Sequence, residues 1–355
     1  MRNYSFSGPF AEHIKNHVQL KQAVGYKYEA EAKHLLRFSS FTAEEYPETS
    51  ILSKEIVLEW CSKKSYEAQA NQGARSSILR QLATYMEGIG IGAYILPKGY
   101  YPAAQQYVPH VYTENELQRF FHQTDQCCYV AECPYRHLIM PVFFRLVYAC
   151  GLRSSEARLL KSENVDMDAG ILSIHHSKKD NSRLVAMSDK LTGRCRNYFE
   201  NVHNLSKGSD WFFPGLNGKP MTVGNIYHNF RRFLWRAGIS HGGRGKGPRV
   251  HDFRHTYACH CLKKWVMEGK DIAAYLPVLK TYMGHDSFEE TAYYLRLTAD
   301  IFPDISIKLE GCYPDIIPRL EGNSDETSPF KVIKVNSNKI LTNQVFAGQS
   351  SMQRL

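Results

Sequence analysis

The stretch Cys150-Gly-Leu-Arg-Ser-Ser-Glu-Ala-Arg-Leu-Leu160 follows an apolar helical pattern over 135–150. We expect Gly151 to end that helix, because glycine adopts the left-handed backbone of a helix C-terminus without strain. Arg153 then stands at the start of a short helix, and Glu156 follows three residues later. The helix dipole disfavours a cation at this end. Arg153 is therefore expected to serve a purpose other than helix stability.

Three further motifs follow in the same half of the chain. His251-Asp-Phe-Arg254 places a histidine and an arginine three residues apart, on one face of a helix. A guanidinium can hold two phosphate oxygens, and a histidine can exchange a proton near neutral pH. Gly284-His285 and the adjacent pair Tyr293-Tyr294 come after them. A His-x-x-Arg pattern alone is usually a surface pair, so the combination carries the signal.

Positive charge is concentrated in one segment of the sequence. The 355 residues carry a formal net charge of +9, from 44 Lys and Arg against 35 Asp and Glu. Residues 231–270 alone hold ten basic and two acidic residues, interleaved with aromatic side chains. A surface that binds a polyphosphate has this composition, because each neutralised phosphate releases counterions. On charge alone, a solvated basic helix face is the alternative.

Other features of the composition exclude several classes of protein. No run of about 18 apolar residues is present, so we expect no transmembrane helix. The first ten residues lack the apolar segment of a secretory signal. The nine cysteines have no paired spacings, which favours reduced thiols and a cytoplasmic location.

Three segments are expected along the chain. Residues 1–109 are interpreted as a helical domain with a linker, residues 110–302 as a second domain, and residues 303–355 as a partly disordered tail. Gly, Pro and Tyr residues over 89–110 indicate the linker. The capping box Thr113-Glu-Asn-Glu116 predicts the first helix of the second domain. Apolar periodicity predicts helices over 10–24, 35–41, 51–61, 78–86, 135–150, 191–202, 223–237, 250–267, 275–283 and 288–297.

β structure is predicted in one place only. The short runs Gly170–His175 and Arg183–Met187 flank the polar turn Ser177–Ser182, a pattern that favours a hairpin. That turn carries Lys178 and Lys179. The expected fold class is therefore mainly α with a small β-hairpin or sheet, an α+β protein.

The order and spacing of these motifs resemble the tyrosine recombinase, or phage integrase, family. The matching pieces are a Gly-Leu-Arg-x-x-Glu box at 151–156, the hairpin lysine Lys178, a His-x-x-Arg box at 251–254, a Gly-His box at 284–285 and Tyr294, nine residues after that histidine. The match spans about residues 110–300. Residues 1–109 look, less specifically, like the family's helical core-binding domain. The resemblance implies a site-specific DNA recombinase that integrates, excises or transposes a mobile element.

The resemblance also implies a chemical mechanism. Tyr294 would attack a DNA phosphodiester to give a 3′-phosphotyrosyl bond and a free 5′-hydroxyl. A phenol is mostly neutral at pH 7 and needs help to lose its proton, which His251 would accept. Lys178 would protonate the leaving 5′-oxygen.

The remaining site residues would stabilise the phosphate. Arg153 and Arg254 would clamp its non-bridging oxygens, and His285 would donate a hydrogen bond to it. Glu156 would orient these phosphate-binding side chains without contacting the phosphate itself. Neither a metal nor another cofactor is implied, because the phosphotyrosine stores the energy. The implied partners are double-stranded DNA, a homotetramer on paired recombination sites, and in some cases accessory DNA-binding or related recombinase proteins.

Some choices stay open at the level of the sequence. Either Lys178 or Lys179 could be the general acid, and counting back from the following strand favours Lys178. The nine-residue offset favours Tyr294 over Tyr293, for which helix packing is the simpler interpretation. A type IB topoisomerase-like or telomere-resolvase enzyme, or a catalytically inactive DNA-binding regulator, is the alternative function.

Further basic residues are candidates for contacts with the DNA backbone. The loop Gly242-Gly-Arg-Gly-Lys-Gly247 is not a nucleotide-binding loop, because no Ser or Thr follows its lysine and no strand precedes it. We expect it to touch DNA. The candidate DNA-binding residues are Lys179, Arg231, Arg232, Arg244, Lys246 and Arg249. No metal site is expected, since the cysteines around residue 130 lack zinc-ligand spacing.

Overall fold

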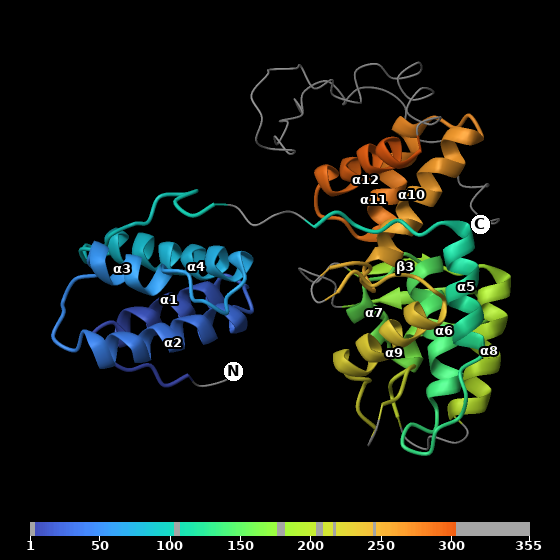
Figure 1. Ribbon diagram of the computed structural model, residues 1–355, viewed down its shortest axis with the longest axis horizontal. Coiled ribbons are helices and arrows are strands. Elements are labelled where there is room, and N and C mark those ends of the chain that lie inside the picture. The colour runs from blue at the N-terminus through green and yellow to red at the C-terminus, as the bar shows by residue number, and fades with distance from the viewer. Residues whose placement is uncertain are drawn as a thin grey trace. The chain divides into compact units, whose positions relative to one another are not determined.

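The computed structural model describes residues 4–102, 107–175, 182–203, 209–215, 218–243 and 246–302 (Figure 1). Lys178, Lys179, Arg244 and the tail 303–355 therefore lie outside the described residues. The chain divides into two compact units, Met1–Tyr107 and Val108–Leu355. Each unit is described by itself below, as unit 1 and unit 2.

Unit 1 is helical. Its helices are α1 (Ala11–Ala23), α2 (Glu29–Glu45), α3 (Lys54–Cys61) and α4 (Gln69–Gly88). They enclose a core that includes Phe38 and Leu82, both fully buried. Helix α4 begins well before the apolar pattern that predicted it. Its first turns are polar but face inward, where Gln72 and Arg75 donate hydrogen bonds to the carbonyls of Cys61 and Trp60.

Eight α-helices are described in unit 2, around a small sheet. They are α5 (Glu114–Asp125), α6 (Arg136–Ala149), α7 (Ser154–Arg158), α8 (Asp189–His203), α9 (Val223–Arg236), α10 (Asp252–Met267), α11 (Ile272–Met283) and α12 (Phe288–Ile301). The predicted capping box is confirmed at the start of α5. One core surrounds the apolar helix α6, and a second joins α10, α11 and α12 (Figure 1).

The sheet of unit 2 has three antiparallel strands in the order β1 (Val165–Asp166), β2 (Ile171–Ile174) and β3 (Arg183–Ala186). Strands β2 and β3 form the predicted hairpin, whose last described pair before the turn is Ile174 with Arg183. Strand β1 was not predicted, because two residues are too few to display alternation. The fold class, mainly α with a small sheet, is confirmed.

Two glycines allow the close packing of the helix ends that carry the sequence motifs. Gly151 follows α6 with φ +56°, and a Cβ there would lie 2.6 Å from the ring of Tyr257. Gly284 ends α11 with φ +66°, and a Cβ there would lie 2.9 Å from Nη1 of Arg183. Any other residue would combine backbone strain with a clash at these positions.

Candidate active site

Helix ends bring the described motif residues of unit 2 together. Arg153 is the N-cap residue of α7, and Arg254 lies in the first turn of α10. His285 follows Gly284, the C-cap residue of α11, and Tyr294 lies within α12. Local sequence explains these placements, because Gly151 turns the chain two residues before Arg153 and Gly284 turns it immediately before His285.

Arg254 occupies the centre of this arrangement. Its side chain is buried, with 1% of the residue exposed. Its guanidinium donates hydrogen bonds to the carbonyl of Gly151 at 2.7 Å and to that of Met283 at 2.6 Å. These carbonyls belong to the C-terminal ends of α6 and α11, where backbone acceptors lack partners within the helix and the dipole favours a cation. The two helix ends therefore accommodate a buried positive charge.

Tyr294 lies beside this arginine. The residue is 4% exposed, and its phenol lies within the influence of the Arg254 charge. Burial raises the pKa of Tyr294 to about 12, although the charge and hydrogen bond of Arg254 oppose that shift. Tyr293 next to it is half-buried and packs against the apolar core of α10 to α12. Arg254 therefore offsets part of the cost of forming the Tyr294 phenolate.

Two histidines lie against the Tyr294 ring, and a third lies beside one of them. His285 stacks on it at a centroid distance of 5.5 Å and is held by a 2.9 Å hydrogen bond between its Nδ1 and Oγ1 of Thr291. His255 lies 5.4 Å from the Tyr294 ring and 4.8 Å from the ring of His251. Desolvation and the nearby arginines lower the pKa of His285 to about 3 and that of His251 to about 4. Both are neutral at pH 7 and can accept a proton.

Glu156 links the arginines on the other side of the site. Its carboxylate accepts hydrogen bonds from Nη1 and the backbone N–H of Arg153, both at 2.9 Å. It also accepts two from Arg183, at 3.0 and 2.8 Å. Burial alone would raise the pKa of Glu156, but Arg183, the Arg153 backbone and the charge of Arg254 outweigh it and lower the pKa to about 2. Three arginines and one carboxylate leave an excess of positive charge, which suits a phosphate.

Sequence reasoning missed two of these residues. His255 directly follows the His-x-x-Arg box, and for Arg183 the sequence pattern indicates only its place at the start of a strand. A signal for His255 was present in its spacing, since residues four apart on a helix lie on one face and place it beside His251. The partners of Arg183 lie far from it in the sequence, so no local pattern identified it.

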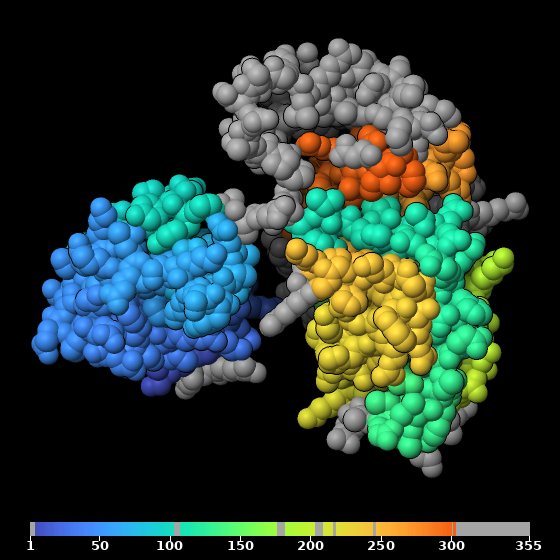
Figure 2. Space-filling model, in the orientation of Figure 1, coloured from blue at the N-terminus to red at the C-terminus, as the bar shows by residue number. Residues whose placement is uncertain are grey.

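The described candidates for DNA contact lie on the surface of unit 2. Lys246 and Arg249 are exposed in the segment before α10, and Arg232 is exposed on α9. Arg231 is half-buried, with its guanidinium 5.8 Å from the ring centre of Tyr227. In Figure 2, α9 and the segment after it, in yellow to gold, lie on the face of this unit that is in view. These positions are accessible to a large anionic partner.

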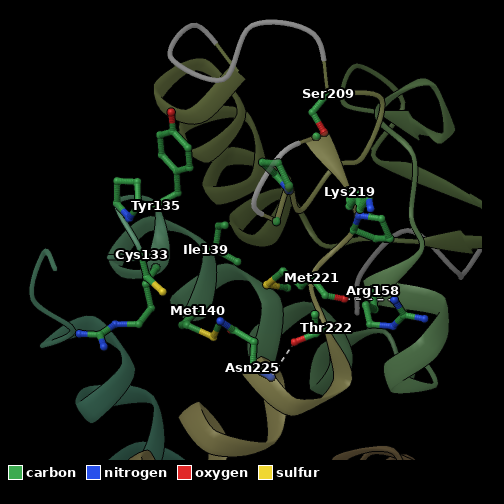
Figure 3. Close-up of a pocket in the computed structure, with 16 residues that line it drawn as sticks. Cys133, Tyr135, Ile139, Met140, Arg158, Ser209, Lys219, Met221, Thr222 and Asn225 are labelled. Carbon is green, nitrogen blue, oxygen red and sulfur yellow. Dashed lines mark hydrogen bonds between the residues drawn. The ribbon is translucent and has the colours of Figure 1, made fainter. Parts of the chain in front are cut away.

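A separate cavity of about 650 Å³ also lies in unit 2, between the start of α6, α7 and the start of α9 (Figure 3). Its lining includes Tyr135, Met140, Arg158 and Met221. None of the candidate catalytic residues lines it.

Among the described residues, no group of three or more His, Cys, Asp or Glu side chains is placed to hold a metal ion. No described helix is long and apolar enough to cross a membrane.

Comparison with known proteins places this geometry in a family. Residues 110–300 match the model of the phage integrase family. The Sinorhizobium fredii protein y4rB, which carries an integrase/recombinase name, is 27% identical over 311 residues, covering 86% of this chain and 98% of its own. The tyrosine recombinase XerD of Pseudomonas aeruginosa is 28% identical over 163 residues, covering 45% of this chain and 50% of its own.

A solved structure shares the fold at lower identity. The Tn1549 transposon integrase in complex with transposon right end DNA has a TM-score of 0.59 and 13% identity, covering 82% of this chain and 99% of that one. Because the family model spans more than half of the residues, the assignment does not depend on this likeness. The chain belongs to the phage integrase family of tyrosine recombinases, and it is a DNA strand-transfer enzyme.

Proposed function

We propose that this enzyme cleaves and rejoins double-stranded DNA at specific sites through a 3′-phosphotyrosyl bond to Tyr294. One observation carries the proposal: the phenol of a buried tyrosine lies within the influence of a buried arginine and packs against two histidine rings. Arg254 lowers the cost of forming the phenolate, and the histidines provide proton acceptors. The same arginine is available to the charge that develops on the attacked phosphate.

In the proposed reaction, Oη of Tyr294 attacks phosphorus and the bond from phosphorus to the 5′-oxygen breaks. The phenolic proton passes from Tyr294 to His251 by way of His255. The ring of His255 contacts both the Tyr294 ring and the His251 ring. The leaving 5′-oxygen takes a proton from Lys178, which the sequence predicts for this role. A 5′-hydroxyl of the partner strand then attacks the phosphotyrosine and gives its proton to Lys178. The bond from phosphorus to Oη of Tyr294 breaks, and the phenolate takes its proton back from His251, so that the enzyme is released unchanged. Atoms and charge balance without an external energy source.

Arg153, Arg254 and His285 are proposed to contact the scissile phosphate. Arg153 is the more accessible arginine, with 22% of its side chain exposed, and it already donates to the carbonyl of Gly284 at 3.0 Å. We further propose a tetramer on two sites and a role in moving a mobile element. The integrase and recombinase names of the relatives support that role.

Covalent capture from a pool of random sequences tests the proposal, because the DNA site is selected in the same experiment. The full chain is incubated with a library of duplexes that carry a randomised central segment and a nick, so that cleavage traps the protein. DNA that stays on the protein after denaturation is then sequenced. We expect an adduct with an enriched sequence, linked through Tyr294 in the digested peptide.

Other outcomes contradict the proposal in different ways. An adduct without any enriched sequence indicates a topoisomerase-like enzyme. DNA binding without an adduct indicates an inactive regulator, and an adduct that persists in Tyr294→Phe assigns the nucleophile to another residue.

A further inference from the structure

Arg183, the first residue of β3, makes a dense set of contacts although it belongs to none of the sequence motifs. Its side chain is only 7% exposed. Two of its nitrogens hold both oxygens of Glu156, and Nε donates to the carbonyl of Tyr282 at 2.8 Å. A planar guanidinium that grips a carboxylate with two bonds fixes the orientation of both groups.

Three arginines bind three consecutive carbonyls at the C-terminal end of α11. Arg183 binds that of Tyr282, Arg254 that of Met283, and Arg153 that of Gly284. The arginines come from three separate elements, namely β3, α10 and the start of α7. The last carbonyls of a helix have no partners within it, so these side chains determine where the turn lies. His285 follows this turn directly.

Glu156 transmits the position of Arg183 to Arg153. Its Oε1 accepts from Nη1 of both arginines, at 3.0 Å from Arg183 and 2.9 Å from Arg153. The guanidinium of Arg183 also packs against Gly284 so closely that a Cβ would lie 2.9 Å from it. Arg183 therefore contacts both the carboxylate that orients Arg153 and the turn that precedes His285.

We propose that Arg183 is a positioning residue for strand cleavage, which places Arg153 and His285 against the scissile phosphate without touching DNA itself. The inference rests on the proposed function, because it assigns those two residues to the phosphate. Arg183 is buried and its nitrogens are occupied, so it acts through Glu156 and the α11 turn. A displacement of about 1 Å in such groups is enough to slow a reaction roughly a hundredfold.

The first test compares Arg183→Met and Arg183→Lys with wild type on a duplex recovered by covalent capture. We expect the single-turnover cleavage rate at saturating DNA to fall roughly a hundredfold in Arg183→Met, with DNA affinity unchanged. Arg183→Lys keeps the charge but not the two-bonded grip, and an intermediate rate is expected. The matched control is Arg145→Met, since Arg145 also grips a carboxylate with two bonds, at 2.8 and 2.7 Å to Asp125.

A substrate with a methylphosphonate at the scissile position separates positioning from a general loss of structure. This group lacks the negative charge that arginine neutralises, so a misplaced Arg153 matters less. The defect of Arg183→Met should shrink on this substrate. An equal defect on both substrates, a matching loss of rate in Arg145→Met, or a rate unchanged from wild type would overturn the proposal.

Hydrogen exchange provides a readout that does not need cleavage. The backbone N–H of His285 donates to the carbonyl of Lys280 at 3.0 Å, and that of Gly284 to Thr281 at 3.1 Å. These amides should exchange faster in Arg183→Met and Arg183→Lys but not in Arg145→Met. Unchanged protection of these amides would refute the role of Arg183, whether or not wild type forms a DNA adduct. The absence of an adduct in wild type would count against the proposed function only.

Discussion

Both units bury a histidine against a tyrosine, yet the two pairs have different surroundings. In unit 1, Nε2 of His17 lies 3.1 Å from the hydroxyl of Tyr28, and the rings meet edge to face. In unit 2, His285 stacks flat on Tyr294, and the charge of Arg254 acts on the phenol. Burial raises the pKa of both tyrosines to about 12. Desolvation is thus common to the two pairs and does not distinguish them.

The neighbouring charges do distinguish them. Glu31 adds to the rise in the pKa of Tyr28, whereas Arg254 opposes the rise for Tyr294. The phenolate is disfavoured in both units, but only in unit 2 does a cation offset part of the cost of burial. The comparison teaches that a buried tyrosine becomes a candidate nucleophile only where a cation accompanies it.

The largest expected effect comes from removing each tyrosine hydroxyl in turn. Tyr294→Phe should abolish the covalent DNA adduct, because no other oxygen replaces the nucleophile. Tyr28→Phe should leave adduct formation unchanged and lower the free energy of unfolding by about 1 kcal/mol, the typical value of one hydrogen bond. Denaturing gels and denaturant titration measure the two quantities. Loss of the adduct in Tyr28→Phe would remove the distinction between the pairs.

The next largest effect is expected at the glycines with positive φ. Gly284→Ala should lower the cleavage rate at least tenfold, since the new Cβ would displace Arg183 and with it Arg153. Gly25→Ala in unit 1 is the matched control, with φ +92° and nothing within 4 Å of a Cβ. Both substitutions should cost about 1–2 kcal/mol of stability through backbone strain. A normal cleavage rate in Gly284→Ala would show that the close packing of Arg183 is dispensable.

Acid sensitivity should be similar in the two units. Burial lowers the pKa of His17 to about 4 and that of His285 to about 3, from 6.5. Below pH 6.5 these histidines are protonated in the unfolded chain but stay neutral in the folded protein. The free energy of unfolding therefore falls as the pH drops from 6.5 towards the pKa values of the folded state. His17→Gln and His285→Gln should each flatten this slope by up to about 1.4 kcal/mol per pH unit. Hydrogen exchange followed against pH measures the slope in each unit.

DNA is expected to break this similarity. A phosphate bound beside His285 should raise its pKa towards the ordinary value, because an anion favours the protonated ring. His17 has no such contact and should titrate as in the free protein. Histidine signals followed by NMR with and without the captured duplex test this difference. Equal shifts of the two histidines would contradict a phosphate site next to His285.

The sequence predicted the residues of unit 2 whose roles depend on local spacing. Thr113 and Glu116 cap a helix through neighbouring backbone groups, and this prediction is confirmed. The family match, likewise predicted, depends on short motifs with fixed internal spacing. The roles assigned to Arg153, Arg254 and Tyr294 stay predictions.

Other features could not be predicted because their causes are not local. Arg183 meets the carbonyl of Tyr282, which lies 99 residues further along the chain. The early start of α4 depends on Gln72 and Arg75 finding carbonyl partners in unit 1, which makes a polar segment face inward. Apolar periodicity detects faces buried by hydrophobic contact and misses those buried by hydrogen bonds.

The smallest expected effect concerns exposed charge, where no buried pair is involved. Lys246 is exposed before α10, and Lys190 is exposed on α8 as a control. If Lys246 neutralises one phosphate, the affinity of Lys246→Ala should depend less steeply on salt. The negative slope of log affinity against log salt should become shallower by about 0.9. Affinity should fall equally for the captured duplex and for unrelated DNA, because a phosphate contact carries no sequence information. A loss of affinity confined to the captured duplex, or an equal loss in Lys190→Ala, would contradict a phosphate contact by Lys246.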